Sequence, residues 1–362
     1  MADGFSADDL EKWTRAARVK RDNPSLSLAE LSVLLPIPDP KRPGKTKPPS
    51  TATVDRWIKA AADLGILEYK VNVPPDAYAA MRLERCLKPK IPNVTASVVP
   101  NGDGKNLDNL SPRAARFLMD TLCAIDKPRT SIVLACGDTV RRTIHEFFEL
   151  LKEEPENKEI LASKTLAVYP ASIHADYRLS PVYPCAAVAL FDVLAAESTW
   201  PDVVEAFTPN LPQAFYERYD TPDKIVGYCV DAGLQPIVDE ARSADVFVIG
   251  LGSTGGNNYR SILNSMDGAI EDSSRISDDV AELLFVPLDK QSNPDQEISD
   301  RIVGIVPDDL RRAINDGRTV LGVFGGSKES LVGCLVRTDP YMNVYITDSS
   351  CARAMIDECR PH

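Results

Sequence analysis

Short apolar runs that end in glycine or polar turns and lead into helical patterns recur along the chain from about residue 76. Four such strand-like runs end at Cys136-Gly-Asp-Thr139, Gly250–Gly256, Gly325-Gly-Ser-Lys328 and Thr347-Asp-Ser-Ser350. After the first of them, Val140–Lys152 has the apolar spacing of a helix. Strands that alternate with helices predict an α/β domain built on a doubly wound, mostly parallel sheet covered on both faces.

The first 75 residues have a different pattern, with three helical stretches and one extended stretch. The helices are expected over Ala7–Lys20, from the capping box Ser27-Leu-Ala-Glu30, and over Thr51–Leu64, which Gly65 ends. Ile66–Val73 then has the pattern of a strand that could form a wing. Three helices followed by a strand is the order of a winged helix-turn-helix. We therefore expect a DNA-binding domain over 1–75 and a second domain over 76–362, with a helical docking or dimerisation domain as the alternative for 1–75.

The third helix has one apolar face and one polar face. Val54, Trp57, Ile58, Ala61 and Leu64 fall at helical spacing and should pack inward. The side chains left outside or at the helix start, which are the candidates for DNA contact, are Ser50, Thr51, Thr53, Arg56 and Lys59. The turn before this helix departs from the usual ~3–4 residues. It is the proline-rich basic stretch 36–49, either a basic loop lying on the DNA backbone or a solvated insertion.

Charge strengthens the division into two parts. The 362-residue chain has a net charge of −12, but residues 1–75 hold 12 Lys or Arg against 10 Asp or Glu, whereas residues 76–362 hold 29 against 43. A small basic module on an acidic body is typical of nucleic-acid contact. No apolar run approaches the ~20 residues of a membrane span, and the polar, acidic N-terminus is unlike a signal peptide. We therefore predict a cytoplasmic protein without membrane attachment.

Cysteine and histidine usage argues against metal sites and disulfide scaffolds. The chain has eight cysteines without a C-x-x-C pair and only three histidines. This pattern predicts reduced thiols and no bound metal.

The turns that follow the four strands should form a ligand site, because ligands of parallel sheets bind at the carboxyl ends of the strands. Glycine-rich turns and free helix amides suit a phosphate-bearing ligand. Gly250-Leu-Gly-Ser-Thr-Gly255 also matches the dinucleotide motif G-x-G-x-x-G. That motif belongs in the first strand–helix turn, with an acidic residue ending the next strand ~20 residues later. Here it follows an earlier unit, and 258–279 shows no such strand, so we expect no nicotinamide or flavin cofactor, and none of another kind.

The succession of these motifs from Leu110 to Met355 resembles the sugar-binding domain of SorC-type transcriptional regulators, which include the deoxyribonucleoside and central glycolytic gene regulators. The motifs that carry the resemblance are Cys136–Thr139, Ala241–Gly252, Asp300–Ile305, Gly325–Lys328 and Tyr345–Asp348. Ala52–Lys59 with Gly65–Glu68 likewise resembles the DNA-reading helix and wing of that family.

The resemblance implies a sugar-phosphate isomerase-like domain that senses a phosphorylated sugar or related metabolite and performs no catalysis. A homodimer or homotetramer would bind a double-stranded DNA operator. The residues that the resemblance places in effector binding are Gly137, Asp138, Thr139, Gly252, Ser253, Thr254, Glu282, Gly325, Gly326 and Lys328. Two departures bear on the ligand: Asp138 would repel a nearby phosphate, and Ala171-Ser172 stands where a glycine pair is usual.

Two alternatives belong to other classes of protein. The same fold hosts sugar-phosphate isomerases and deaminases, whose general base could be Asp138, Glu282 or Asp348, with residues 1–75 as a docking domain. A protein-binding scaffold is the third, although it would leave the glycine-rich turns and Lys328 without a role. The N-terminal module distinguishes a regulator from an isomerase, because an isomerase does not need residues 1–75.

Overall fold

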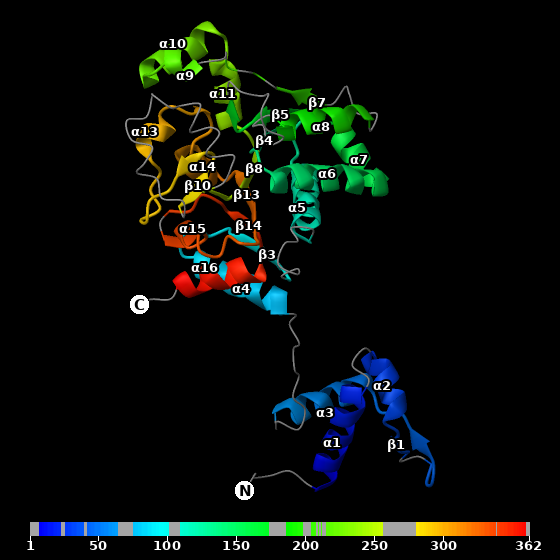
Figure 1. Ribbon diagram of the computed structural model, residues 1–362. Helices are drawn as coiled ribbons and strands as arrows, with labels where there is room; N and C mark the ends of the chain where they lie inside the picture. The colour runs from blue at the N-terminus through cyan, green and yellow to red at the C-terminus, as the bar shows by residue number, and fades with distance from the viewer. Residues whose placement is uncertain are drawn as a thin grey trace. The chain divides into compact units, whose positions relative to one another are not determined.

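The computed structural model of the chain describes residues 7–22, 26–39, 42–63, 75–100, 109–173, 186–197, 204–207, 209, 211, 215–255, 280–337 and 339–359 (Figure 1). The chain divides into two compact units, Met1–Val73 and Pro74–His362, and each is described by itself. No helix among these residues is long and apolar enough to cross a membrane.

The N-terminal unit contains three helices around a small apolar core. They are α1 (Ala7–Asp22), α2 (Leu28–Leu34) and α3 (Thr51–Asp63). The predicted capping box begins α2: the Ser27 hydroxyl accepts a hydrogen bond from the Glu30 amide, and the Glu30 carboxylate accepts one from the Ser27 amide at 2.8 Å. The buried apolar residues are Ala16, Ala17, Leu31, Leu35, Val54, Ile58 and Ala61. The predicted inner face of the third helix is therefore confirmed, apart from Leu64, which lies outside the described residues.

The proline-rich stretch between α2 and α3 forms an antiparallel hairpin. Its strands are β1 (Ile37–Pro38) and β2 (Thr46–Lys47), with Ile37 opposite Lys47 and Pro38 opposite Thr46. The sequence predicted only a loop or insertion here. The strand expected over 66–73 lies outside the described residues.

A seven-stranded sheet forms the centre of the large unit, and all its neighbouring strands are parallel. Its spatial order is β3-β14-β13-β8-β4-β5-β7. The strands are β3 (Thr95–Val99), β14 (Val344–Asp348), β13 (Thr319–Phe324), β8 (Val246–Gly250), β4 (Arg129–Leu134), β5 (Thr165–Pro170) and β7 (Val204–Ala206). β4, β8, β13 and β14 are the four strands predicted from the apolar runs. Their residues are almost all buried, as expected for strands with both faces covered.

Helices cover both faces of this sheet (Figure 1). One face carries α5 (Leu110–Ala124), α6 (Asp138–Glu153), α7 (Pro155–Ala162) and α8 (Ala186–Glu197). The other carries α4 (Pro75–Leu87), α11 (Gln235–Arg242), α14 (Pro307–Asn315), α15 (Cys334–Arg337) and α16 (Ser349–Glu358). The predicted doubly wound α/β class is confirmed.

Smaller elements lie at the carboxyl ends of the central strands. β9 (Gly252–Ser253), β10 (Ala281–Leu283) and β11 (Val286–Pro287) form an antiparallel sheet, and β6 (Ser172–Ile173) pairs with β12 (Val303–Gly304). Around them lie α9 (Phe215–Arg218), α10 (Pro222–Asp231) and α13 (Gln296–Ser299). A second apolar cluster, which includes Phe215, Ile225 and Phe285, holds this part together.

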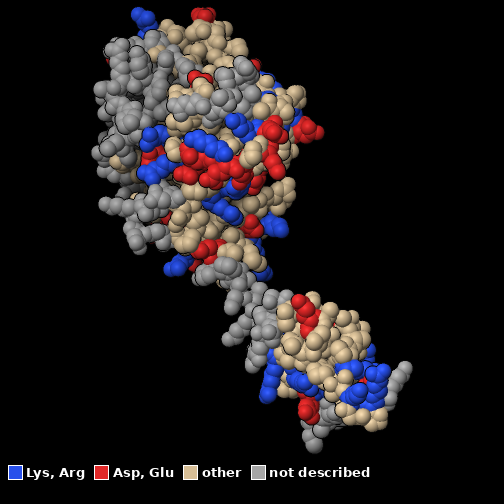
Figure 2. Space-filling model, turned by 90° about the vertical axis from the view of Figure 1, so that its right-hand side faces the viewer, with Lys and Arg blue, Asp and Glu red and all other residues tan. Residues whose placement is uncertain are grey.

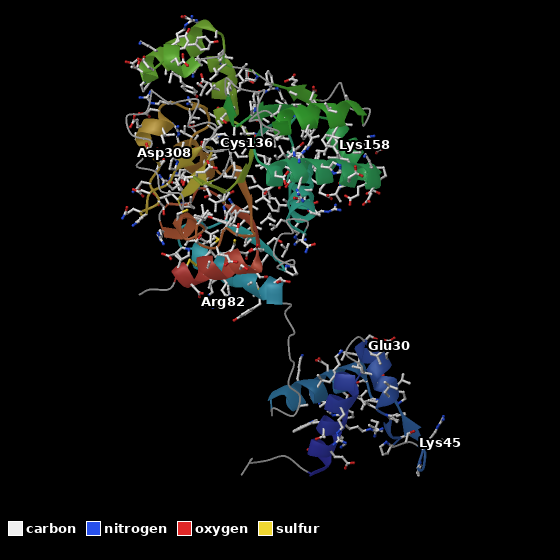
Figure 3. All side chains as sticks on the ribbon, in the orientation of Figure 1. Glu30, Lys45, Arg82, Cys136, Lys158 and Asp308 are labelled. Carbon is white, nitrogen blue, oxygen red and sulfur yellow. A yellow bond between two sulfur atoms is a disulfide. The ribbon has the colours of Figure 1, made fainter. Side chains whose placement is uncertain are left out.

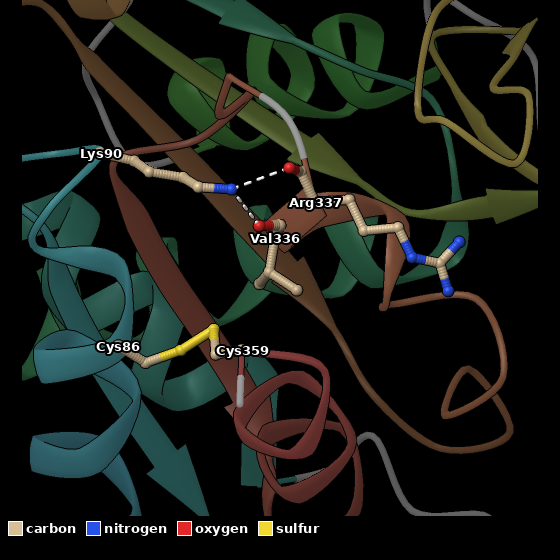
Figure 4. Close-up of a disulfide and its surroundings, with 5 residues drawn as sticks. All are labelled: Cys86, Lys90, Val336, Arg337 and Cys359. Carbon is tan, nitrogen blue, oxygen red and sulfur yellow. Dashed lines mark hydrogen bonds between the residues drawn. A yellow bond between two sulfur atoms is a disulfide. The ribbon is translucent and has the colours of Figure 1, made fainter. Parts of the chain in front are cut away.

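A disulfide joins Cys86 of α4 to Cys359, directly after α16 (Figure 4). Their Cα atoms are 6.1 Å apart, within the range of bonded pairs. Beside it, the Lys90 ammonium donates to the carbonyl oxygens of Val336 and Arg337 at 2.5 and 2.8 Å (Figure 4). The prediction of reduced thiols is therefore wrong for Cys86 and Cys359. The reason is that 273 residues separate them, and only the packing of α4 against α16 brings them together.

Candidate functional site

A pocket of the large unit lies where the order of the strands reverses. From β4 the chain proceeds outward through β5 and β7, then returns to place β8 on the other side of β4 and proceeds through β13 and β14. A crevice opens outside the carboxyl ends of the strands at such a point. The cavity there measures about 200 Å³. It is lined by Ala135, Cys136, Gly137, Asp138, Thr139, Val140, Ala171, Ser172, Gly250, Leu251, Gly252, Ser253, Glu282, Leu284, Phe285 and Lys328.

The turn after β4 supplies one wall and the start of α6. Cys136 lies two residues after the end of β4 (Figure 3), and Gly137 precedes the helix with a φ of 120°, a conformation that favours glycine. The first amides of α6 have no partner within the helix, so this end favours an anion or a hydroxyl oxygen. The Asp138 carboxylate accepts hydrogen bonds from Arg141 and Arg142, both at 2.8 Å.

These two arginines determine how Asp138 acts on a ligand. Their hydrogen bonds, that of Arg141 first, lower the pKa of Asp138 despite its partial burial. Asp138 is therefore a carboxylate with two cationic partners, both on the exposed side of α6. The repulsion of a phosphate that the sequence suggested is compensated within the helix itself.

The turn after β8 forms a strand instead of a dinucleotide loop. Gly250 ends β8, and Gly252-Ser253 pairs with β10, with Gly252 opposite Glu282 and Ser253 opposite Ala281. A dinucleotide motif leads into a helix at this point. Glycine is required at position 252 for a different reason: a Cβ atom there would lie 1.5 Å from the Oε1 atom of Glu282.

Glu282 and Lys328 both line the pocket and interact electrostatically. The Oε2 atom of Glu282 accepts a hydrogen bond from the Phe285 amide at 2.7 Å. Burial raises the pKa of Glu282 to about 7, against the opposing effects of this hydrogen bond and of Lys328. Burial also lowers the pKa of Lys328, although the nearby Glu282 acts in the other direction. A carboxyl that changes charge near neutrality can accept a sugar hydroxyl or exchange a proton.

Leu284 and Phe285 line the pocket, which the sequence analysis did not predict. They form the two-residue turn between β10 and β11, with φ values of 56° and 68°. Such turns are normally built from glycine, asparagine or aspartate, so the apolar pair Leu-Phe carries no turn signal. Both side chains are buried and give the cavity an apolar wall. Strained backbone of this kind is concentrated at functional sites.

Three of the effector candidates do not line this cavity. Thr254 is buried, and its hydroxyl and the backbone of Val280 form mutual hydrogen bonds at 3.3 Å. The Gly326 amide donates to the Asp348 carboxylate at 2.5 Å, and a Cβ on Gly325 would lie 2.7 Å from the same carboxylate.

Asp348 therefore has a structural role at the start of α16. It also accepts a hydrogen bond from the Cys351 amide at 2.9 Å, which makes it the N-cap of this helix. The turn Thr347–Ser350 is absent from the lining of the cavity, whereas the other three predicted turns each contribute to it. Gly137, Asp138, Thr139, Gly252, Ser253, Glu282 and Lys328 are the predicted residues that meet there.

The candidate DNA-binding residues lie on the outer side of α3. Ser50 accepts a hydrogen bond from the Thr53 amide at 3.2 Å, and the two hydroxyl oxygens are 2.8 Å apart. Thr51, Arg56 and Lys59 are exposed. The Lys59 ammonium lies 2.8 Å from Asp55, which raises the pKa of Lys59 and partly compensates its charge. Arg56 is thus the stronger candidate for a phosphate or base contact.

Within the described ranges, no group of three or more His, Cys, Asp or Glu side chains could hold a metal ion.

The architecture is that of SorC- and DeoR-type transcriptional regulators, which confirms the resemblance seen in the sequence at the level of the fold. The full-length sorbitol operon regulator SorC from Klebsiella pneumoniae aligns with 97% of this chain over 100% of its own, at 17% identity and a TM-score of 0.53. A DeoR family transcriptional regulator from Listeria monocytogenes aligns with 76% of this chain and 99% of its own, at 14% identity and a TM-score of 0.54.

A domain described as sugar-binding in a transcriptional repressor from Vibrio fischeri aligns with 77% of this chain and 99% of its own, at 15% identity and a TM-score of 0.53. No protein-family model matches the sequence, and no curated protein matches it significantly.

Proposed function

We propose that this protein is a DNA-binding transcriptional regulator whose large unit senses a sugar phosphate or a related hydroxyl-rich metabolite. The observation that carries the proposal is the pocket at the strand reversal. It combines the N-terminal end of α6, the hydroxyls of Thr139 and Ser253, and the side chains of Glu282 and Lys328. The alignment with a full-length operon regulator over nearly the whole chain supports the same function.

The chemistry of the pocket supports this ligand class. The Lys328 ammonium and the amides of α6 can bind a phosphate or several oxygens, while Glu282 can accept a hydroxyl. Leu284 and Phe285 offer an apolar wall for the C–H face of a sugar ring. A cavity of about 200 Å³ suits a small metabolite better than a dinucleotide.

Two measurements on the full chain test the proposal. A thermal-shift screen of sugars and sugar phosphates should find a ligand that stabilises the protein, by about 2.7 kcal/mol at 100 times its dissociation constant. Selection from a random pool of DNA duplexes should recover a preferred sequence. Arg56→Ala should weaken binding to that sequence, and Lys59→Ala should lower the salt slope by about one unit if Lys59 meets a phosphate. Failure to enrich any duplex would contradict the regulator assignment.

The raised pKa of Glu282 favours one second candidate, a sugar-phosphate isomerase, because a general base works best with a pKa near the operating pH. Incubating the protein with each ligand found in the screen and following the sugar by NMR distinguishes the two functions. A regulator should leave the ligand unchanged, whereas an isomerase should convert it and Glu282→Gln should abolish the conversion.

A further inference from the structure

The segment that contains the hairpin β1–β2 accounts for the net positive charge of the N-terminal unit. Residues 36–49 contain four Lys or Arg and one Asp, whereas the rest of residues 1–75 contains eight basic and nine acidic residues. Without this segment the unit would be slightly acidic, like the remainder of the chain. A nucleic acid would therefore meet its main electrostatic attraction at the hairpin.

Backbone hydrogen bonds hold the described residues of the hairpin in place. Besides the strand pairing, the Asp39 amide donates to the Lys45 carbonyl at 2.8 Å, and the Arg42 and Lys45 amides close the turn with bonds of 3.1 and 3.0 Å. Gly44 has a φ of 81°, which suits this tight turn. Prolines in and around the strands fix φ and lower the entropy lost when the segment is immobilised on a partner. The cations are thus held on a preformed scaffold.

The described cations of the hairpin, Arg42, Lys45 and Lys47, are exposed, and two of them have no acidic partner among the described residues. All of residues 42–48 are exposed. Lys47 lies 3.9 Å from Asp39, but no acidic side chain in the described part of the chain lies within 4.0 Å of Arg42 or Lys45. Lys45 lies on the hairpin turn, away from the three helices (Figure 3). Figure 2 shows basic side chains prevailing on this face of the N-terminal unit, whereas the large unit shows acidic and basic groups intermixed.

The hairpin also lies close to the candidate DNA-binding helix. β2 ends at Lys47 and α3 begins at Thr51, so the chain between them spans at most about 14 Å. The major groove is about 12 Å wide and is bordered by phosphates on both sides. A helix that enters the groove with its N-terminal end therefore brings Lys47, at the near end of the hairpin, within reach of the flanking backbone.

We propose that the hairpin Ile37–Lys47 contacts the DNA backbone beside the groove entered by α3, with Arg42, Lys45 and Lys47 binding phosphates. This inference rests on the proposed DNA-binding function and adds a second contact surface to it. Phosphate contacts carry no sequence information, so the hairpin supplies affinity and orientation while α3 supplies sequence preference.

The test uses the full-length protein and a fluorescein-labelled 30-base-pair duplex of random sequence, with anisotropy measured from 50 to 200 mM KCl. Each phosphate contact contributes about 0.9 to the slope of log affinity against log salt. The variant Arg42→Gln/Lys45→Gln/Lys47→Gln should therefore lower the slope by about 2–3. It should weaken binding at 0.1 M salt by roughly 60- to 500-fold.

Two further variants make the result specific. Lys88→Gln/Lys152→Gln/Lys224→Gln removes the same number of exposed charges from the large unit and should leave the slope unchanged. Arg42→Lys/Lys45→Arg/Lys47→Arg keeps the charges and should bind like the wild type.

The outcomes distinguish failure of the hairpin inference from failure of the proposed DNA-binding function. Wild-type binding with an unchanged slope in the hairpin variant overturns the inference and leaves DNA binding standing. If the hairpin variant and the large-unit variant lose DNA affinity equally, the inference is also overturned, because the effect would then come from the net charge of the protein. Absence of wild-type binding to any duplex overturns the proposed function together with the inference.

Discussion

Gly252 determines where the Glu282 carboxylate can lie, because a side chain at position 252 would occupy the space of that carboxylate. The sequence predicted that Gly252 and Glu282 share a site. It did not reveal their direct contact, because the pairing of β9 with β10 joins segments 30 residues apart. The match to a dinucleotide motif arises here from close packing against a carboxylate.

The raised pKa of Glu282 predicts a stability that decreases as the pH rises through neutrality. The folded protein holds this carboxyl at a pKa of about 7, above its ordinary value of 4.5. Between these values the folded state keeps a proton that the unfolded chain has lost. The contribution is complete below about pH 4.5 and disappears as the pH rises through about 7. The full shift corresponds to about 3 kcal/mol.

Urea unfolding of the wild type and Glu282→Gln between pH 5 and 8 measures this contribution. The variant cannot ionise at this position, so the stability of the wild type relative to it should decrease by about 2–3 kcal/mol over the range. Lys328, whose pKa is lowered by burial, is present in both proteins, so the comparison is made at the same lysine. A constant difference between the two proteins would show that Glu282 has an ordinary pKa.

At the scale of elements, the sequence predicted the strands whose residues are buried on both faces of the sheet. β4, β8, β13 and β14 were found because strands buried on both faces need continuous apolar runs. The hairpin β1–β2 was missed because its many prolines argue against strands, although Pro43-Gly44 marks a turn. The turn Leu284–Phe285 was missed because it has none of the residues that mark a hairpin turn. The predicted strand-end turns contribute to the pocket except for Thr347–Ser350, where Asp348 caps α16.

The disulfide between α4 and α16 predicts a stability that depends on reduction. It closes a loop of 273 residues, and the loss of such a link typically costs about 2–5 kcal/mol because the unfolded chain regains freedom. Reductant should therefore lower the melting temperature of the wild type, and Cys359→Ser should melt at the reduced wild-type temperature with or without reductant.

Cys123→Ser is the matched control, since Cys123 is a free thiol on the opposite face of the sheet. This variant should respond to reductant as the wild type does. Alkylation of Cys86 and Cys359 in the unfolded, unreduced protein would show instead that the two thiols are not joined.

At the scale of the whole molecule, the candidate DNA-contacting and effector-binding residues lie in different compact units. The charge asymmetry between residues 1–75 and 76–362 led to the prediction that DNA binding belongs to the first unit, because a basic surface is needed only where a polyanion binds. The sequence could not predict that the basic charge is concentrated on a hairpin, since the pairing of β1 with β2 is a property of the folded unit. Sensing and DNA binding should consequently be separable by single substitutions.

Lys328→Met tests this separation. Lys328 lines the pocket, and losing a charge-assisted bond to a bound phosphate costs about 1.5–3 kcal/mol. Affinity for a phosphorylated effector should therefore decrease by roughly 10- to 150-fold. Binding of effector-free protein to DNA should stay the same, because Lys328 belongs to the large unit. DNA binding is measured across an effector titration for the wild type, Lys328→Met and the exposed-lysine control Lys152→Met. This experiment gives both the effector affinity and the effector-free DNA affinity of each protein. If Lys328→Met responds at the wild-type effector concentration, the effector phosphate does not lie at this pocket. If its effector-free DNA binding is also weakened, the two units do not act as separable modules.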